Sequence, residues 1–289
     1  MKKKLSLEQF LRARDYLMSH GRDIEQQLFR YYFEHGSSGH VINALKNYQG
    51  EDGGFRNLGE GHAVITNVMD TSMAFQYLSE VGATINDEIV QKGINYLIAA
   101  YDHEHEGWQG RPYQQNRGWL DNPCAELVGY LYEYRELVPV DFLTHVTEKA
   151  ISCMVAFKDS DDEYYFLDAL CLLRLAVRID EPHQTKILEM LANNIPEIIE
   201  TNREKWATTY CAKPFFFAHS PNSPLFLRIQ HDVIRSLENE IDTQAEDGHF
   251  VLNWHANEES AVAWKSIWTM DALRAFQHHH MIETKNTAI

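Results

Sequence analysis

Basic residues are scarce in this chain, which has 26 Lys and Arg against 42 Asp and Glu and a formal net charge of −16. Binding to the phosphates of a nucleic acid needs clustered Lys and Arg, so the composition disfavours a nucleic-acid partner. Long apolar runs are absent as well: the most apolar stretch, residues 166–177, contains Asp168 and Arg174 and is too short to cross a bilayer. We therefore expect a cytoplasmic protein with no transmembrane segment.

Cysteine motifs and cofactor motifs are also missing. The four cysteines form no Cys-x-x-Cys pair, so neither a zinc ribbon nor a redox dithiol is indicated. The sequence contains no glycine-rich phosphate loop, no nucleophile elbow and no His-Glu-x-x-His motif. We accordingly predict no cofactor and no metal ion.

Helical periodicity dominates what the sequence does contain. Apolar residues recur at three- and four-residue spacing, whereas period-two runs rich in Val, Ile and Thr are absent. Pro123, Pro139 and Pro182 stand where helices are expected to begin or to be joined. The sequence predicts an all-α fold with helices over residues 68–78, 85–100, 125–137, 142–157, 164–177, 184–199 and 261–276.

A short motif recurs between these helices. Residues 49–55 and 244–250 share the pattern Gln-x-x-x-Gly-x-Phe, residues 102–108 form a looser copy, and residues 159–165 form a degenerate one. We expect a glycine with a positive φ angle in each turn, followed by an aromatic ring packed between helix pairs. The spacing of the aromatic residues predicts one further helix pair around residues 184–212. Repeated helix pairs stack into a curved or closed array.

This motif, which closes one helix and recurs with each helix pair, resembles the repeats of squalene–hopene (terpenoid) cyclases and protein prenyltransferase β subunits. The chain is more similar still to a bacterial group within that superfamily, in segments such as 53–57, 122–126 and 221–224. The resemblance implies an α/α toroid of about five to six helix pairs, with inner and outer rings around a central cavity. We expect a single domain over residues 1–289, with a helical pair at 1–36, repeat helices over 37–280 and a tail at 281–289.

Two motifs resemble the catalytic motifs of that superfamily. The segment at residues 159–162 resembles the Asp-x-Asp-Asp acid motif of class II cyclases, in which crowded carboxylates keep one acid protonated. The same residues, Asp161 and Asp162 among them, also form a capping box before the next helix, which is the interpretation we favour. Asp121 and Cys124 resemble two of the three zinc ligands of prenyltransferases at a different spacing, so their part in a metal site is left open.

Acidic and aromatic side chains gather in the segments expected at one rim of the toroid. They could stabilise a cation or line a sugar cleft. Asp70, Asp168 and Trp264 lie inside predicted inner helices and are therefore expected to face the cavity. The candidate catalytic residues are Asp70, Asp168, Asp161 and Asp162, and the candidate substrate-binding residues are Trp108, Trp119, Trp254, Trp264 and Glu126.

Three functions stay open. The first is an enzyme that acts on a hydrophobic or isoprenoid substrate held in the central cavity, as the resemblance implies. The second is a carbohydrate-active lyase or hydrolase, which would need two opposed carboxylates in an open cleft. The third is a non-catalytic binding or scaffold protein, because a fold does not determine a function.

Overall fold

A computed structural model describes residues 2–59, 65–109, 122–154, 165–256 and 258–283. These residues form eleven α-helices, several short 3-10 turns and no β-strand, so the predicted all-α class is confirmed for the described part of the chain. No helix among them is long and apolar enough to span a membrane. The helices are α1 (Leu7–His20), α2 (Asp23–Phe33), α3 (Ser38–Leu45), α4 (Val68–Glu80), α5 (Glu88–Ala99), α6 (Cys124–Glu133), α7 (Val140–Met154), α8 (Tyr165–Ala176), α9 (His183–Ile198), α10 (Phe226–Asp242) and α11 (Glu258–His278).

The chain divides into two compact units, which we describe separately. The central unit comprises Ser38–Asn193, and the terminal unit combines Met1–Ser37 with Asn194–Ile289. Helix α9 crosses the boundary between them. The closed α/α toroid and the single domain over residues 1–289 stay predictions.

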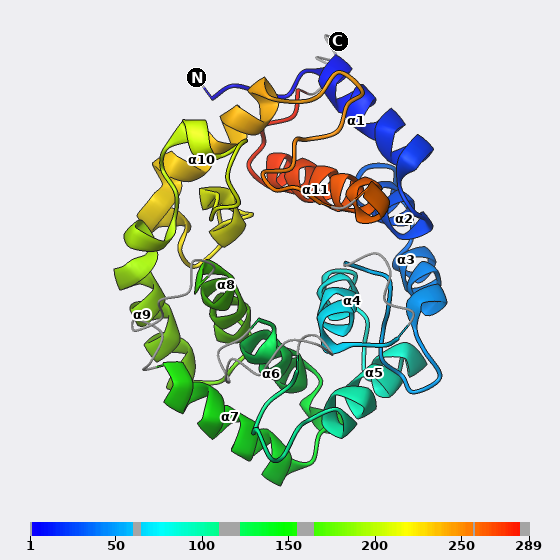
Figure 1. Cartoon of the computed structure of the whole chain (residues 1–289), viewed down its shortest axis with the longest axis vertical. Helices are drawn as coiled ribbons and strands as arrows, with labels where there is room; N and C mark the ends of the chain where they lie inside the picture. The colour runs from blue at the N-terminus through cyan, green and yellow to red at the C-terminus, as the bar shows by residue number, and fades with distance from the viewer. Residues whose placement is uncertain (1, 60–64, 110–121, 155–164, 257, 284–289) are drawn as a thin grey trace. The chain divides into compact units, whose positions relative to one another are not determined.

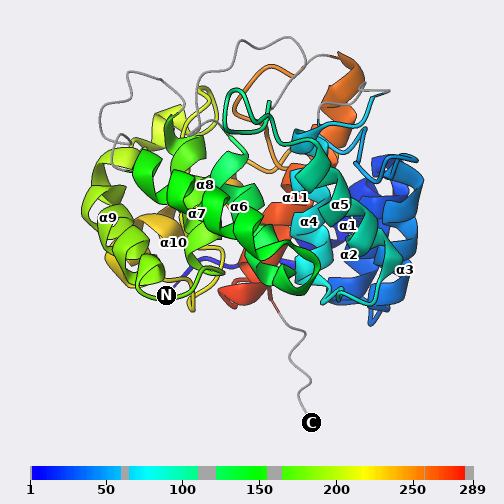
Figure 2. The ribbon, with the colours of Figure 1, turned by 90° about the horizontal axis from the view of Figure 1, so that it is seen from below.

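In the central unit, α4, α6 and α8 form a row of parallel neighbours. The ring of Phe75 on α4 lies 5.4 Å from that of Tyr130 on α6, and one turn further along Ser79 donates a hydrogen bond to Glu133. Glu126 on α6 pairs with Arg174 on α8, and Glu133 at the end of α6 pairs with Arg178 just beyond α8, so the partners advance in the same direction. Helices α3 and α5 pack on α4, and α7 packs on α6 (Figure 1 and Figure 2). This unit therefore contains a row of three helices with further helices packed on it, and the curved or closed array of helix pairs stays a prediction.

The first copy of the repeated motif forms a tight turn held by its glutamine. The side-chain amide of Gln49 donates hydrogen bonds to the carbonyl oxygens of Gly53 and Ile89, each at 2.9 Å. Gly53 has a φ angle of +92°, which confirms the predicted left-handed glycine. The Phe55 ring is fully buried, and its backbone N–H donates to Thr71 Oγ1 at 2.9 Å.

The second copy repeats this construction in the terminal unit. The amide of Gln244 donates to the carbonyl oxygens of Gly248 at 2.9 Å and Gln9 at 3.0 Å. Gly248 has a φ angle of +102°. Phe250 is fully buried, and its N–H donates to Thr269 Oγ1 at 3.1 Å.

Helix α1 meets the second turn in the same way that α5 meets the first. A Cβ atom added to Gly53 would lie 2.3 Å from the Lys92 carbonyl oxygen, three residues after Ile89. A Cβ atom added to Gly248 would lie 2.2 Å from the Arg12 carbonyl oxygen, three residues after Gln9. The first helix of the chain therefore completes the repeat that ends in α11. It does so as half of the predicted N-terminal pair, since α1 and α2 both pack on α11.

The third copy keeps the aromatic ring but changes the turn. Trp108 is buried and donates from its indole N–H to the Leu97 carbonyl oxygen at 2.7 Å. Two backbone hydrogen bonds join Asp102 and Gly107, and the residue with a positive φ angle is Glu106, at +53°. The expectation of a left-handed glycine is thus wrong for this copy. The fourth copy, at 159–165, lies outside the described residues except for its last position, where α8 begins.

The segment between α9 and α10 differs from the predicted helix pair. Helix α9 is present, but residues 199–212 contain only a 3-10 turn at Arg203–Lys205 and close on themselves through a backbone bond from Glu200 to Ala212. Trp206 fills this loop: its ring is fully buried and its indole N–H donates to the Glu200 carbonyl oxygen at 2.7 Å. A side chain of that size supplies a local core without a helix.

The two ends of the described chain meet in the terminal unit. Leu5 and Ile282 form an isolated parallel bridge: the Leu5 N–H donates to the Met281 carbonyl oxygen at 2.7 Å, and the Glu283 N–H donates to the Leu5 carbonyl oxygen at 3.0 Å. Residues 281–283, which were expected to begin a tail, are therefore paired with the N-terminal segment.

Candidate functional site: the tryptophan cluster

Four aromatic side chains of the terminal unit pack together at the start of α11. The ring of Trp254 lies 5.4 Å from Trp264 at an interplanar angle of 81°, and 5.2 Å from Trp268 at 67°. Tyr210 also contacts Trp254, at 5.3 Å and 62°. We call these four residues the tryptophan cluster. Their edge-to-face geometry is the one that aromatic quadrupoles favour.

The sequence explains why these rings converge. Trp264 and Trp268 are four residues apart on α11, so they lie one above the other on the same face of the helix. Trp254 lies in the segment that joins the second repeat turn to α11, and it therefore reaches the first turns of that helix. Tyr210, Trp254 and Trp264 remain partly exposed, whereas Trp268 is buried. The cluster thus presents aromatic surface to its surroundings.

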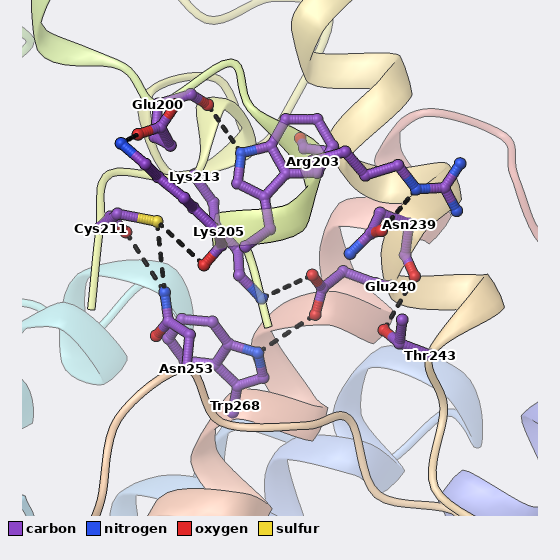
Figure 3. Close-up of polar contacts among 12 residues, drawn as sticks. Glu200, Arg203, Lys205, Cys211, Lys213, Asn239, Glu240, Thr243, Asn253 and Trp268 are labelled. Carbon is purple, nitrogen blue, oxygen red and sulfur yellow. Dashed lines mark hydrogen bonds and ion pairs between the residues drawn. The ribbon is translucent and has the colours of Figure 1, made fainter. Parts of the chain in front are cut away.

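A buried ion pair fixes the base of the cluster (Figure 3). Lys213 Nζ lies 2.6 Å from Glu240 Oε1, and the two side chains are 2% and 1% exposed. Glu240 Oε2 accepts the indole N–H of Trp268 at 3.3 Å, and the Lys213 ammonium lies 4.8 Å from the centroid of that ring. Two charges removed from water need compensating partners, and here the carboxylate and the ring face supply them. These contacts hold Trp268 in one orientation.

Cys211 and Asn253 border the same ion pair (Figure 3). The Asn253 side-chain amide nitrogen donates a hydrogen bond to the Cys211 carbonyl oxygen at 3.4 Å and lies 3.7 Å from the Cys211 sulfur. The other polar atom of this amide is therefore the oxygen, Oδ1. Asn253 is buried, and its Oδ1 has no hydrogen-bond partner among the described residues. Burial raises the pKa of the Cys211 thiol, although the positive charge of Lys213 opposes the shift. The thiol is therefore protonated at neutral pH and is a poor nucleophile.

The structure brings together two of the predicted substrate-binding residues, Trp254 and Trp264. Trp108 lies in the central unit, where its ring packs edge-on against Tyr101 at 5.0 Å and Phe142 at 6.4 Å, a position within the repeat core. Trp119 and the predicted catalytic residues Asp161 and Asp162 lie outside the described residues.

Glu126, also predicted to bind substrate, links α6 to α8. Its side chain is 1% exposed, Oε1 accepts the Tyr130 hydroxyl at 2.7 Å, and Oε2 accepts Arg174 Nη1 at 2.6 Å. Burial, followed by the Glu126 charge, raises the pKa of Tyr130 well above its usual value, so this phenol stays a hydrogen-bond donor. These contacts support a structural role, and contact with a substrate stays a prediction.

The other two predicted catalytic residues lie in the first turns of α4 and α8. Asp70 is buried: Oδ1 accepts the backbone N–H groups of Leu58 at 3.2 Å and Gly59 at 2.7 Å, and Oδ2 accepts the Asn67 amide at 2.9 Å. This carboxylate therefore anchors the loop that follows the first repeat turn. Asp168 is partly exposed in the first turn of α8, where a carboxylate suits the helix dipole. The catalytic role of both stays a prediction.

Cys124 is buried at the start of α6, as its position after Pro123 predicts. Its thiol donates to the Trp108 carbonyl oxygen at 3.4 Å, and Cys171 on α8 donates to Asn122 Oδ1 at 3.3 Å. Asp121 lies outside the described residues. In the part of the chain that the structure describes, no three His, Cys, Asp or Glu side chains are grouped so that they could hold a metal ion.

Sequence analysis missed Lys213, Glu240 and Asn253. A signal existed for Lys213, because this lone charge stands between Ala212 and the apolar run at 214–217 and therefore needs a buried partner. The identity of that partner, 27 positions later on α10, depends on tertiary packing. No family model matches this sequence, and no curated protein matches it either.

Proposed function

We propose that the protein binds a small hydrophobic ligand of the isoprenoid class at the tryptophan cluster, as a member of the terpenoid cyclase and prenyltransferase-like toroid proteins. The observation that carries this proposal is the position of Trp254, which contacts three aromatic rings and yet remains partly exposed. Aromatic surface left in water is unfavourable by about 25 cal/mol per Å². A ligand that covers these rings would recover that free energy.

Preorganisation favours binding at this site. Glu240 and Lys213 fix Trp268, and Trp268 in turn packs against Trp254. A ligand that meets a rigid aromatic surface does not have to order it, so more of the contact energy appears as affinity. The repeated turns and the parallel row of α4, α6 and α8 support membership of the toroid class.

A carbohydrate ligand is the second candidate, and the partial exposure of Tyr210, Trp254 and Trp264 is the observation that favours it. Exposed aromatic faces suit the apolar faces of a sugar ring. The third candidate, a scaffold without a ligand, predicts that the rings bind neither class of compound. All three can be separated in one titration.

The experiment follows tryptophan fluorescence and heat while the full-length protein is titrated with farnesol, farnesyl diphosphate and cellotetraose. We expect saturable binding of farnesol, and weaker binding of the diphosphate because the net charge is −16. Trp264→Ala should weaken farnesol binding about tenfold, since a large hydrophobic anchor contributes more than 1 kcal/mol. Val262→Ala, which truncates an exposed side chain on the same helix, is the matched control.

The outcomes separate the candidates. Binding of cellotetraose alone would establish the carbohydrate alternative, and binding of no compound would leave the scaffold. Binding of farnesol that is unchanged by Trp264→Ala would show that the ligand site lies elsewhere. Incubation with the bound isoprenoid followed by mass spectrometry of the products then tests for catalysis.

A further inference from the structure

Trp254 and Trp264 form a corner with two nearly perpendicular walls. Their ring centroids are 5.4 Å apart and their planes meet at 81°, so an edge of one indole meets the face of the other, and both residues remain partly exposed. Tyr210 adds a third aromatic group at 5.3 Å from Trp254. The parts of these ring faces that remain exposed carry the negative potential that attracts a cation.

The protein already places one cation on this set of rings. The Lys213 ammonium lies 4.8 Å from the centroid of Trp268, whose other contacts include Trp254. That ammonium also has a carboxylate partner, because Glu240 binds it at 2.6 Å. The pair is close to neutral, so Lys213 does not repel a second positive group from the exposed side of the cluster.

Charge over the whole chain favours the same ligand. A net charge of −16 raises the local concentration of small cations around the protein.

We propose that the corner formed by Trp254 and Trp264 binds a methylated ammonium group. A quaternary ammonium spreads its charge over methyl groups and has no N–H donors, so ring faces alone can replace its water shell. A primary ammonium would leave N–H donors unpaired in the same corner. This inference rests on the site of the proposed function and names a ligand class that the site accepts.

The test compares charge at constant shape. The full-length protein is titrated by calorimetry with choline chloride, with tetramethylammonium chloride, and with 3,3-dimethyl-1-butanol, in which carbon replaces the choline nitrogen. We expect choline to bind at least about tenfold more tightly than the neutral alcohol, and added salt to weaken choline alone. Trp264→Leu, which keeps an apolar side chain but removes the π face, should abolish this preference.

Variants and controls keep each result interpretable. Trp264→Phe retains a weaker π face and should reduce choline affinity several-fold, which gives a graded result if Trp264→Leu fails to fold. Val262→Ala should leave choline binding unchanged. Equal affinity for choline and its neutral analogue, or choline binding that survives Trp264→Leu, would overturn the inference. Farnesol in the same titration separates the two proposals. If farnesol binds and choline does not, the proposed function stands and only the inference about methylated ammonium groups is overturned.

Discussion

Gln244 donates its side-chain amide to the main-chain carbonyl oxygen of Gln9 at 3.0 Å, which joins two residues 235 positions apart. Gln49 makes the equivalent bond to Ile89, only 40 positions away. The same turn therefore docks on a helix that follows it in one case and on the first helix of the chain in the other. The local geometry of the turn therefore determines this contact, and the number of residues between the turn and the helix does not.

The substitution Gly248→Ala should destabilise the protein more than the substitution of an exposed glycine by alanine. Its φ angle of +102° is strained for alanine, and the new Cβ would lie 2.2 Å from the Arg12 carbonyl oxygen. We expect a loss of at least about 3 kcal/mol in urea-induced unfolding. Gly82→Ala is the control: its φ angle is +72°, nothing lies within 4 Å of the added Cβ, and the loss should be about 1 kcal/mol. Equal losses would show that the close approach to α1 is unimportant.

Lys213→Met should reduce the free energy of unfolding by about 3 to 5 kcal/mol, because it leaves the Glu240 carboxylate buried without its cation. The double variant Lys213→Met with Glu240→Leu should recover part of this loss, since an apolar pair of similar volume needs no charge compensation, although the Trp268 indole N–H loses its acceptor. Thermal and urea unfolding of all variants measure the difference. Lys205→Met removes the exposed pair with Glu200 and should change stability by less than about 1 kcal/mol. A double variant as unstable as the single one would contradict this account.

Glu126→Gln tests whether this carboxylate is structural. The substitution weakens the bonds to Tyr130 and Arg174, and we expect about 2 kcal/mol of destabilisation, because more than a third of the Arg174 side chain is exposed and solvent offsets part of the loss. Glu148→Gln changes an exposed carboxylate on α7 and should have little effect. A Glu126→Gln protein of unchanged stability that no longer binds ligand would support the predicted substrate contact instead.

His279 should make the terminal unit sensitive to mild acid. Burial lowers the pKa of its imidazole below 6.5, and Nε2 lies 3.0 Å from the Ala218 carbonyl oxygen. The unfolded chain then binds a proton more readily than the folded one, so stability is complete above pH 6.5 and falls as the pH drops below it. Urea midpoints at pH 7.5 and pH 5.5 should differ more for the wild type than for His279→Gln. An identical difference in both proteins would assign the acid sensitivity to other groups.

The helices could be predicted from sequence because local periodicity and local breakers determine them. Helix α4 begins at the residue that the pattern predicted. The first and last residues of α5 and α11 each lie within three residues of their predicted positions. Helix α10 was missed although Ile229, Val233, Leu237 and Ile241 recur every fourth residue and are all buried. The repeat spacing placed a helix earlier, where the structure has the loop around Trp206 instead.

The candidate site was predictable only in part. Trp254 and Trp264 were predicted because the sequence shows several aromatic residues close together after the second repeat turn. The pairing of Lys213 with Glu240 depends on how η5 (Pro214–Phe217) packs on α10, which no local pattern encodes. Asp70 and Glu126, whose contact with a substrate stays a prediction, hold backbone or side-chain donors, because buried carboxylates need partners whether or not they have a function.

The terminal unit draws one helical pair from residues before position 38 and the rest from residues after position 193. During synthesis α1 leaves the ribosome before the central unit, yet its docking surfaces, the turn around Gly248 and the apolar side of α11, are translated after that unit. The central unit can therefore fold before α11 is translated, whereas α1 and α2 must wait for α11. A nascent protein stalled before residue 244 should expose these two amphipathic helices to chaperones.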